Sequence, residues 1–199
     1  MDATNRRTSA LSLGNIDDIP PPCRSCVFWE FGSADAKPAE DADDPALEKE
    51  AWVSATLLEW GSCGLIAYAG DAPVGYVLYA PPAYLPRALA FPSGPVGADA
   101  LHLATARVVP AARGMGFGRT LVATAARDLA GRGFRALEAF GDARNKADRC
   151  VLPAGFLLAM GFRTVRPHRH WPRLRLDLSP AGELRAEVRA DVDLVVGRI

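Results

Sequence analysis

The alternation of apolar and polar positions along the chain predicts strands and helices in succession. Runs with a period of two residues predict strands, and apolar residues three or four positions apart predict amphipathic helices. The predicted strands are 64–69, 73–80, 101–109, 134–140, 162–166 and 174–178, and the predicted helices are 45–60, 117–130 and 153–160. The strand–helix–strand succession within residues 101–140 is a βαβ unit, so its two strands should be parallel. The pattern therefore predicts an α/β fold.

Three stretches lack this periodicity. The polar residues 1–10 are expected to form a flexible tail, and the acidic residues 32–45 are expected to form a mobile loop. Residues 81–99 contain five prolines and predict a long loop, whose aromatic residues favour a wall of a substrate pocket. The length of 199 residues and the absence of internal repeats predict a single domain over residues 1–199.

The two ends of the pattern are the least regular. Residues 11–14 alternate as an opening strand of a sheet would. From Leu184 to Val196, apolar residues alternate as in a strand, and some of them also fit one face of a helix. We predict a hairpin across residues 179–182, followed by a final helical turn.

Composition narrows the class of protein. Hydrophobic residues make up 49% and charged residues 23%, as in ordinary globular domains. The 23 basic residues balance 23 acidic ones, which argues against a nucleic-acid binder and against a polybasic membrane-surface protein. The chain has neither an apolar run of bilayer length nor a signal-like N-terminus. We therefore expect a cytoplasmic protein, with no nucleic-acid or membrane partner, whose four cysteines are thiols.

A glycine-rich turn joins the predicted strand 101–109 to the predicted helix 117–130. Glycines 114, 116 and 118 allow a tight turn and close approach of a ligand, and the helix start exposes unpaired N–H groups. Arg113 and Arg119 add positive charge at the rim. These features predict a cradle for a phosphate or pyrophosphate.

Three other interpretations of this turn compete with a phosphate cradle. A P-loop ends in Gly-Lys-Ser/Thr, whereas Gly118 is followed by Arg119-Thr120. A dinucleotide fingerprint needs a wider last glycine step, although Glu138 lies about 20 residues on, where that fold holds its ribose carboxylate. A turn that merely packs a helix onto a sheet would not need Arg113 ahead of the glycines.

The turn resembles that of the GNAT superfamily of acyl-CoA-dependent N-acyltransferases. The matching residues are Val108-x-Pro110-x-x-Arg113-Gly114-x-Gly116-x-Gly118-x-x-Leu121, and the later Phe156-Leu157-x-x-x-Gly161-Phe162 resembles the second landmark of the family. The order of elements fits from Leu11 to Leu178. The resemblance implies a mixed, twisted sheet of six or seven strands flanked by about four helices.

The resemblance also implies a binding site for acetyl-CoA as co-substrate. Its pyrophosphate would lie on the turn and its pantetheine arm between the two parallel strands. The implied cofactor-binding residues are Val108, Val109, Arg113, Gly114, Met115, Gly116, Phe117, Gly118, Arg119 and Cys150. The backbone near Val108 and Val109 would polarise the thioester carbonyl, because a tetrahedral oxyanion needs a fixed N–H donor.

The sequence departs from the family at two positions. Many members carry a Tyr that protonates the departing thiolate, where this chain has Leu157. A thiol pKa of about 8.5 makes a dedicated acid dispensable; alternatively, Tyr79 or Tyr84 enters the site or simply packs at its edge. Many members carry an Asn where this chain has Cys150, whose thiol touches the pantetheine arm, exchanges disulfides with CoA, or packs at a helix start.

Several side chains are candidates for proton transfer or metal binding. His102 and Glu138 are the candidate catalytic residues, because each lies on a strand that should flank the thioester and could take the proton of the amine. Cys23 and Cys26 form a C-x-x-C segment that marks a possible subgroup. It is open to zinc binding, a reversible disulfide, or packing along the acceptor pocket. His168 and His170 supply only two ligands, so no metal is predicted.

These observations favour one function and leave a second open. We expect transfer of an acetyl group from acetyl-CoA to a primary amine of a small molecule or protein, by direct attack and without a covalent enzyme intermediate. The alternative is a non-catalytic acyl-CoA-binding regulatory protein, which the absence of the Tyr makes conceivable. A homodimer is a further expectation.

Overall fold

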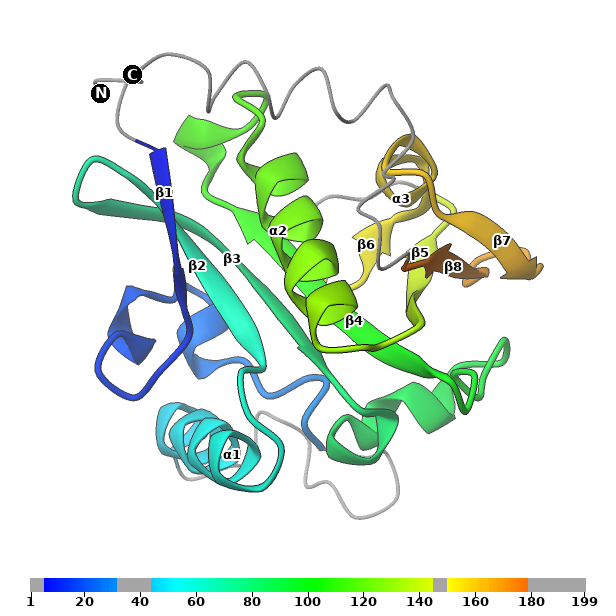
Figure 1. Ribbon diagram of the computed structural model, residues 1–199, viewed down its shortest axis with the longest axis horizontal. Coiled ribbons are helices and arrows are strands. Elements are labelled where there is room, and N and C mark those ends of the chain that lie inside the picture. Colours follow the sequence, from blue (N-terminus) through cyan, green and yellow to red (C-terminus); the bar gives the residue numbers. More distant parts are fainter. Residues whose placement is uncertain (1–5, 32–43, 145–149, 179–199) are drawn as a thin grey trace.

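The structure is a computed structural model that describes residues 6–31, 44–144 and 150–178 (Figure 1). Within those residues it contains eight strands and three α-helices. The strands are β1 (Arg6–Ala10), β2 (Gly64–Ala69), β3 (Ala72–Ala80), β4 (Ala100–Val108), β5 (Ala136–Asp142), β6 (Leu152–Pro153), β7 (Arg163–Arg166) and β8 (Arg173–Asp177). The helices are α1 (Pro45–Glu59), α2 (Phe117–Gly131) and α3 (Ala154–Ala159).

The strands form one mixed sheet in the order β1-β2-β3-β4-β5-β8-β7, with β6 beside β5. The pairs β4–β5 and β5–β6 are parallel and the other pairs are antiparallel. The βαβ unit β4–α2–β5 explains the central parallel pair, because a crossover helix is needed to bring the chain back in the same direction. The predicted α/β fold with a mixed sheet is confirmed.

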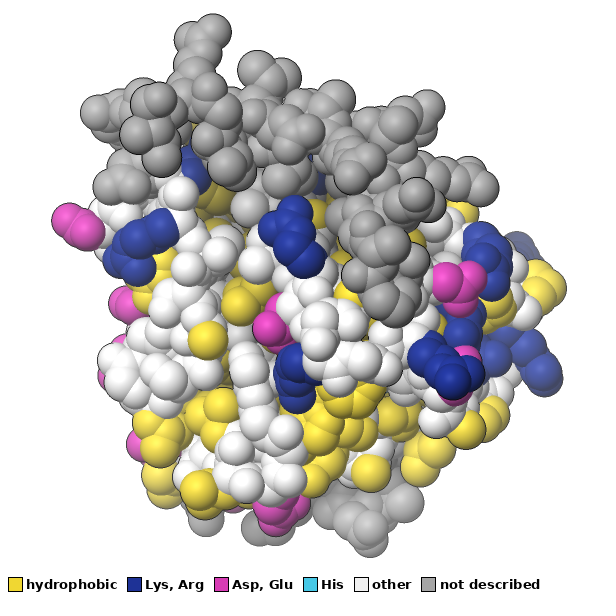
Figure 2. All heavy atoms as spheres, viewed as in Figure 1, with side chains coloured by type: hydrophobic (Ala, Val, Ile, Leu, Met, Phe, Trp, Pro, Cys, Tyr) yellow, Lys and Arg dark blue, Asp and Glu magenta, His cyan; other side chains and the backbone are white. Residues whose placement is uncertain are grey.

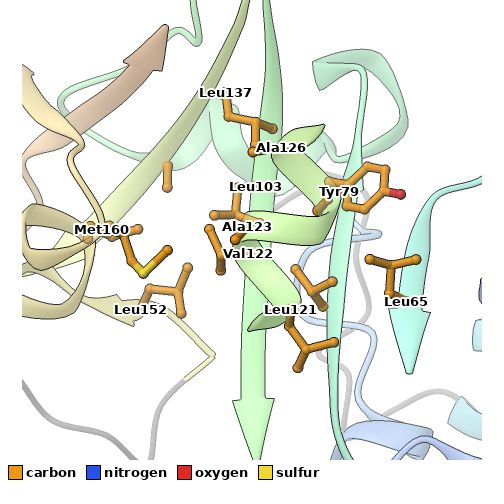
Figure 3. Close-up of a cluster of buried hydrophobic side chains, with 14 of the residues drawn as sticks. Leu65, Tyr79, Leu103, Leu121, Val122, Ala123, Ala126, Leu137, Leu152 and Met160 are labelled. Carbon is orange, nitrogen blue, oxygen red and sulfur yellow. The ribbon is translucent and has the colours of Figure 1, made fainter. Parts of the chain in front are cut away.

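Both faces of the sheet are buried. Leu65, Val77 and Leu103 point to the face that α2 covers, and the Figure 3 close-up shows side chains of α2 meeting those of the strands. The alternating neighbours Ile66 and Leu78 point to the opposite face, against residues 11–29 and α1. The period of two residues along β2 and β3 therefore divides the core into two layers.

The helices begin where the sequence predicts. Asp44 caps α1 with its side chain, which accepts hydrogen bonds from the backbone N–H of Ala46 (3.0 Å) and Leu47 (3.1 Å), and Pro45 occupies the first helical position. Gly116 precedes α2 at φ +88°, in the left-handed region where glycine is least strained. Thr120 N–H donates the first intrahelical bond to the carbonyl of Gly116, at 3.0 Å.

An irregularity in β4 opens the middle of the sheet. Leu78 on β3 faces Thr105 and Tyr79 faces Leu103, so Ala104 is an extra residue between them. A β-bulge of this kind bends its strand and increases the local twist. On its other side, β4 pairs with β5 only as far as His102 opposite Glu138, although both strands continue. The two parallel strands thus separate beyond this point, as the resemblance implies.

The first strand lies earlier than expected. Residues 6–10 belong to an ordered edge strand and not to a flexible tail, whereas residues 11–14 follow that strand. The reason is that β1 carries polar residues at the sheet edge, where Arg7 stacks over the ring of Tyr68 at 3.7 Å. Leu11 is instead buried in the core beneath.

Further differences concern short elements. The described residues contain eight strands and three α-helices, in place of the expected six or seven strands and about four helices. The additional strand β6 has only two residues, and residues 23–25 form a 3₁₀ turn, as do residues 82–84 and 86–90 within the predicted long loop. Pro45, the last residue of the predicted acidic loop, is instead the first residue of α1. The remainder of the predicted acidic loop, the start of the predicted N-terminal tail and the predicted C-terminal hairpin lie outside the described residues.

Candidate active site

A groove of about 470 Å³ opens on the α2 face of the sheet, where β4 leaves β5. The end of β4, the glycine-rich turn and the start of α2 form one wall, and β6 with α3 forms the other. The lining residues are Ala106, Arg107, Val108, Ala112, Arg113, Gly114, Gly116, Phe117, Gly118, Arg119, Leu152, Pro153 and Phe156. The groove is largely apolar at the strand end and basic at the turn.

The glycine-rich turn presents backbone to this groove. Gly114 and Gly116 have φ values of +75° and +88°, which side-chain-bearing residues rarely adopt. No side chain caps the start of α2, so its first-turn N–H groups and the positive end of the helix dipole face the turn. Such an arrangement binds phosphate oxygens.

A residue from the edge of the sheet supports the turn. The Arg6 guanidinium donates a hydrogen bond to the carbonyl of Met115 at 2.8 Å and lies 4.9 Å from the centre of the Phe117 ring. Sequence reasoning missed this residue, since no local pattern links positions 109 residues apart. Arg6 thus adds a cation beside the turn that also holds Arg113 and Arg119.

A small cavity of about 50 Å³ lies on the opposite face of the sheet. Its residues come from segments far apart in the sequence: Pro22, Cys23, Cys26, Phe28, Trp29, Glu30, Lys49, Tyr76, Leu78, Thr105, Arg107 and Cys150. Lys49 from α1 forms an ion pair with Glu30, and both side chains are almost fully buried. Glu30 also accepts a hydrogen bond from the backbone N–H of Trp29 at 3.0 Å. The cavity therefore has charged walls in an otherwise apolar layer.

An open groove of about 470 Å³ adjoins the cavity. Its walls are mainly aromatic and apolar: Phe28, Arg87, Ala90, Phe91, Pro92, Cys150, Val151 and Trp171. Phe28 and Cys150 line both this groove and the small cavity, and Arg107 lines both the small cavity and the groove on the α2 face. The three hollows are thus linked in succession by the lining residues that they share.

Comparison with known proteins agrees with this geometry. The profile of the acetyltransferase (GNAT) family matches residues 26–156, more than half of the chain. The chain belongs to the GNAT acetyltransferase family. No curated protein matches the sequence.

Solved structures with the GNAT fold resemble the chain at low identity. An N-acetyltransferase from Staphylococcus aureus Mu50 is 14% identical, with a TM-score of 0.59 over 88% of this chain and 99% of that one. The yncA protein of Salmonella typhimurium with its cofactor acetyl-CoA is 15% identical, with a TM-score of 0.59 over 88% and 95%. The ribosomal-protein-S18-alanine N-acetyltransferase of Escherichia coli is 15% identical, with a TM-score of 0.51 over 91% and 99%. At these identities the likeness establishes the fold.

Most residues that the GNAT resemblance assigned to the cofactor line the α2-face groove. They are Val108, Arg113, Gly114, Gly116, Phe117, Gly118 and Arg119. Three others lie elsewhere. Val109 donates its N–H to the carbonyl of Val74 at 2.8 Å, Met115 packs at the margin of the core, and Cys150 lines the hollows of the opposite face. The Val109 amide is therefore engaged within the sheet.

His102 is fully buried in an aromatic layer. Its ring packs edge-on against Trp29 (centroids 4.7 Å apart) and Phe140 (5.4 Å). Neither ring nitrogen has a hydrogen-bond partner among the described residues, and burial lowers the pKa of the imidazole to about 3. His102 lines none of the three hollows. The ring is separated from the small cavity by Trp29, so its position and its low pKa favour a packing role over proton transfer.

Glu138 is held in place by two arginines of β8. Its carboxylate lies 3.0 Å from Arg173 and 3.1 Å from Arg175, and it accepts a hydrogen bond from the N–H of Gly97 at 2.9 Å. These contacts tie the long loop to the sheet. Glu138 lines none of the three hollows.

Leu157, at the position of the family's Tyr, and the alternative residues Tyr79 and Tyr84 lie in the core or near the surface. Leu157 is fully buried between α3 and the sheet, in agreement with a packing role. Tyr79 belongs to the same layer, where it meets the ring of Trp60. The Tyr84 hydroxyl donates to Glu59 at 3.1 Å. None of these residues lines a hollow of the candidate site.

Other candidate sites find structural explanations. In the described part of the chain, no group of three or more His, Cys, Asp or Glu side chains could hold a metal ion. His168 accepts backbone hydrogen bonds from His170 (3.2 Å) and Trp171 (3.0 Å) and so fixes a turn. Among the described helices, none is both long and apolar enough to cross a membrane.

The basic edge of the sheet is internally paired. Figure 2 shows basic side chains, all arginines, gathered over β7 and β8 with acidic side chains among them. Arg163 lies 2.5 Å from Asp177, and Arg175 lies 2.6 Å from Asp99. These carboxylates offset the positive charge of this edge.

Proposed function

We propose that the chain transfers an acetyl group from acetyl-CoA to a primary amine. The observation that carries this proposal is the pair of hollows on opposite faces of the sheet, which share Arg107 where β4 leaves β5. A direct transfer needs the thioester and the amine to meet from two sides, and the gap between the strands provides that meeting place.

The α2-face groove fits CoA. Acetyl-CoA supplies the activated acetyl group; the chain binds and orients it. The turn at Gly114 and Gly116 and the uncapped start of α2 offer N–H groups to the pyrophosphate, with Arg113 and Arg119 beside them. The apolar walls near Val108 and Phe156 suit the pantetheine arm.

The acceptor amine would enter by the open groove on the other face. Phe28, Phe91 and Trp171 form aromatic walls, and Arg87 stands over the ring of Phe28 at 4.6 Å. This lining favours an amine, on a small molecule or a protein, that carries an aromatic or extended apolar group next to the reacting nitrogen. Four free thiols fit a reducing compartment, so we place the reaction in the cytoplasm.

The structure favours a different proton acceptor from those that the sequence suggested. An alkylammonium has a pKa near 10.4, so the amine must lose a proton before it attacks. Glu30 is the carboxylate that lines the cavity together with Thr105 and Arg107 of β4, whereas Glu138 and His102 do not line it. We therefore assign proton acceptance to Glu30, directly or through a water molecule.

The function is tested by thiol release when the protein is mixed with acetyl-CoA and a panel of aromatic, aliphatic and peptide amines. We expect release of CoA with the aromatic amines and an acetylated product detected by mass spectrometry. Glu30→Gln should lower turnover by about 10²–10⁴-fold, as for a general base, while Glu59→Gln should not. CoA binding without turnover across the panel would instead support the regulatory protein.

A further inference from the structure

Two cysteines from distant parts of the chain face each other beside the small cavity. The sulfurs of Cys26 and Cys150 lie 3.4 Å apart, although the residues are separated by 124 positions. The indole N–H of Trp29 donates to the carbonyl of Cys150 at 3.0 Å and fixes this approach. The sequence suggested Cys23 and Cys26 as a pair, but the sulfur contact in the structure joins Cys26 to Cys150.

This thiol pair is within reach of a small molecule. Both side chains are partly exposed, and Cys150 lines the open groove of about 470 Å³ as well as the cavity. The other two cysteines differ: Cys23 is buried, and Cys63 is completely buried in the core. Only the Cys26–Cys150 pair, among the four cysteines, combines mutual contact with access from a groove.

The surroundings also activate one sulfur of the pair. A hydrogen bond from the Cys150 thiol is the largest influence on Cys26 and lowers the pKa of Cys26 to about 6, while the pKa of Cys150 is raised for the same reason. A thiolate is the nucleophile in thiol–disulfide exchange. Burial raises the pKa of Cys63 to about 12, which leaves it inert near neutral pH.

From this geometry we propose that Cys26 and Cys150 form a thiol–disulfide exchange site for low-molecular-weight disulfides. The Cys26 thiolate attacks one sulfur of the disulfide RSSR, forming a mixed disulfide and releasing RS⁻, which takes a proton. The Cys150 thiol then loses its proton and attacks the Cys26 sulfur, releasing the second RSH. In sum, RSSR is reduced to two RSH and the two protein thiols are oxidised to one disulfide.

The disulfide would have a consequence for the proposed acetyl transfer. It would join Cys26, which lies between β1 and α1 and lines the cavity, to Cys150, which precedes β6 and lines both the cavity and the open groove. We expect oxidation to hinder the acceptor while CoA still binds, because neither cysteine lines the α2-face groove. This consequence rests on the proposed function, whereas the exchange chemistry does not.

The test treats the reduced full-length protein with oxidised glutathione or with CoA disulfide, and measures released thiol and cross-linked peptides. We expect two thiols released per chain and a Cys26–Cys150 peptide that dithiothreitol separates. Cys150→Ala should release one thiol and stop at a mixed disulfide on Cys26. Faster reaction with CoA disulfide would identify that molecule as the preferred reagent, and equal rates would indicate small disulfides in general.

Two control variants make the result specific. Cys23→Ala and Cys63→Ala should form the Cys26–Cys150 disulfide as the wild type does. A Cys23–Cys26 cross-link in the wild type, or no reaction with either disulfide, would overturn the proposal. Calorimetry with CoA and amine turnover are then compared before and after oxidation; a disulfide that forms without slowing turnover would overturn the predicted effect on the acceptor and leave the exchange site standing.

Discussion

The two sides of the central gap are built in different ways. On the α2 face, the groove is formed largely by one continuous stretch, residues 106–119, which presents glycine backbone and a helix start. On the other face, the cavity is formed by side chains from the N-terminal segment, α1, β3, β4 and the residues before β6. A local motif can encode the first kind of site, but the second exists only after the chain has folded.

The two faces therefore differ in how far their chemistry depends on the identity of side chains. Backbone N–H groups bind a phosphate in any chain that can make the turn, so the CoA side needs few side-chain identities. The acceptor side depends on which ions, thiols and rings meet there. We expect substitutions on the CoA face to change cofactor binding, and substitutions on the acceptor face to change stability, acceptor choice and redox behaviour.

The buried ion pair of the acceptor face gives the largest expected effect. Lys49→Met leaves the buried carboxylate of Glu30 without its counter-charge and should lower the free energy of unfolding by about 3–5 kcal/mol. Glu30→Leu combined with Lys49→Met removes both charges and should recover most of the loss. Urea denaturation of the wild type, Lys49→Met and the double variant measures the free energy of unfolding of each. A Lys49→Met variant as stable as the wild type would contradict a stabilising role for the ion pair.

The second stability prediction concerns Leu157, on the face of the sheet that holds the proposed CoA groove. Because its side chain is fully buried against the sheet, Leu157→Ala should cost about 2–5 kcal/mol of stability. Turnover per folded molecule should change little, since the residue lines no hollow. Leu158 is exposed, and Leu158→Ala serves as the control with little effect. A large loss of turnover at full stability would show that Leu157 shapes the site directly.

The pH dependence of stability tests the position of His102. An unfolded histidine binds a proton below about pH 6.5, whereas the folded His102 does so only near its pKa of about 3. Between these values the unfolded state holds more protons, so this histidine makes stability fall as pH decreases, by about 1.4 kcal/mol per pH unit.

The variant His102→Leu should remove that contribution and retain turnover per folded molecule. Denaturation at several pH values between 4.5 and 6.5 measures the slope, with His170→Gln as a control that keeps it. An unchanged dependence of stability on pH in His102→Leu, or a loss of turnover with the fold intact, would support His102 as a proton acceptor.

The sequence predicted the elements with strong local signals. The start of α1 at residue 45, the strands β2 and β3 and the turn before α2 each follow from a few neighbouring residues, and the structure confirms them. The strand β1 escaped prediction because an edge strand has only one bonded neighbour and tolerates polar residues on both faces. Its position depends on β2, more than 50 residues away in the sequence.

The candidate site likewise contains features that the sequence predicted and contacts that only the tertiary structure shows. The glycine-rich turn carried a readable signal, whereas the contacts of Glu30 with Lys49 and of Cys26 with Cys150 join positions 19 and 124 residues apart. Strand position alone favoured His102 and Glu138 as proton acceptors. The aromatic rings around His102 and the arginines around Glu138 could be known only from the tertiary structure.

The most direct test of the central claim is calorimetry with CoA on two glycine variants. Gly116 and Gly133 have similar positive φ values, +88° and +85°, but only Gly116 lines the α2-face groove. Valine at either position strains the backbone alike. We expect Gly116→Val to weaken CoA binding by at least about 100-fold, close to 2.7 kcal/mol, while Gly133→Val binds CoA as the wild type does. Equal affinity in a folded Gly116→Val protein would contradict the assignment of the cofactor groove.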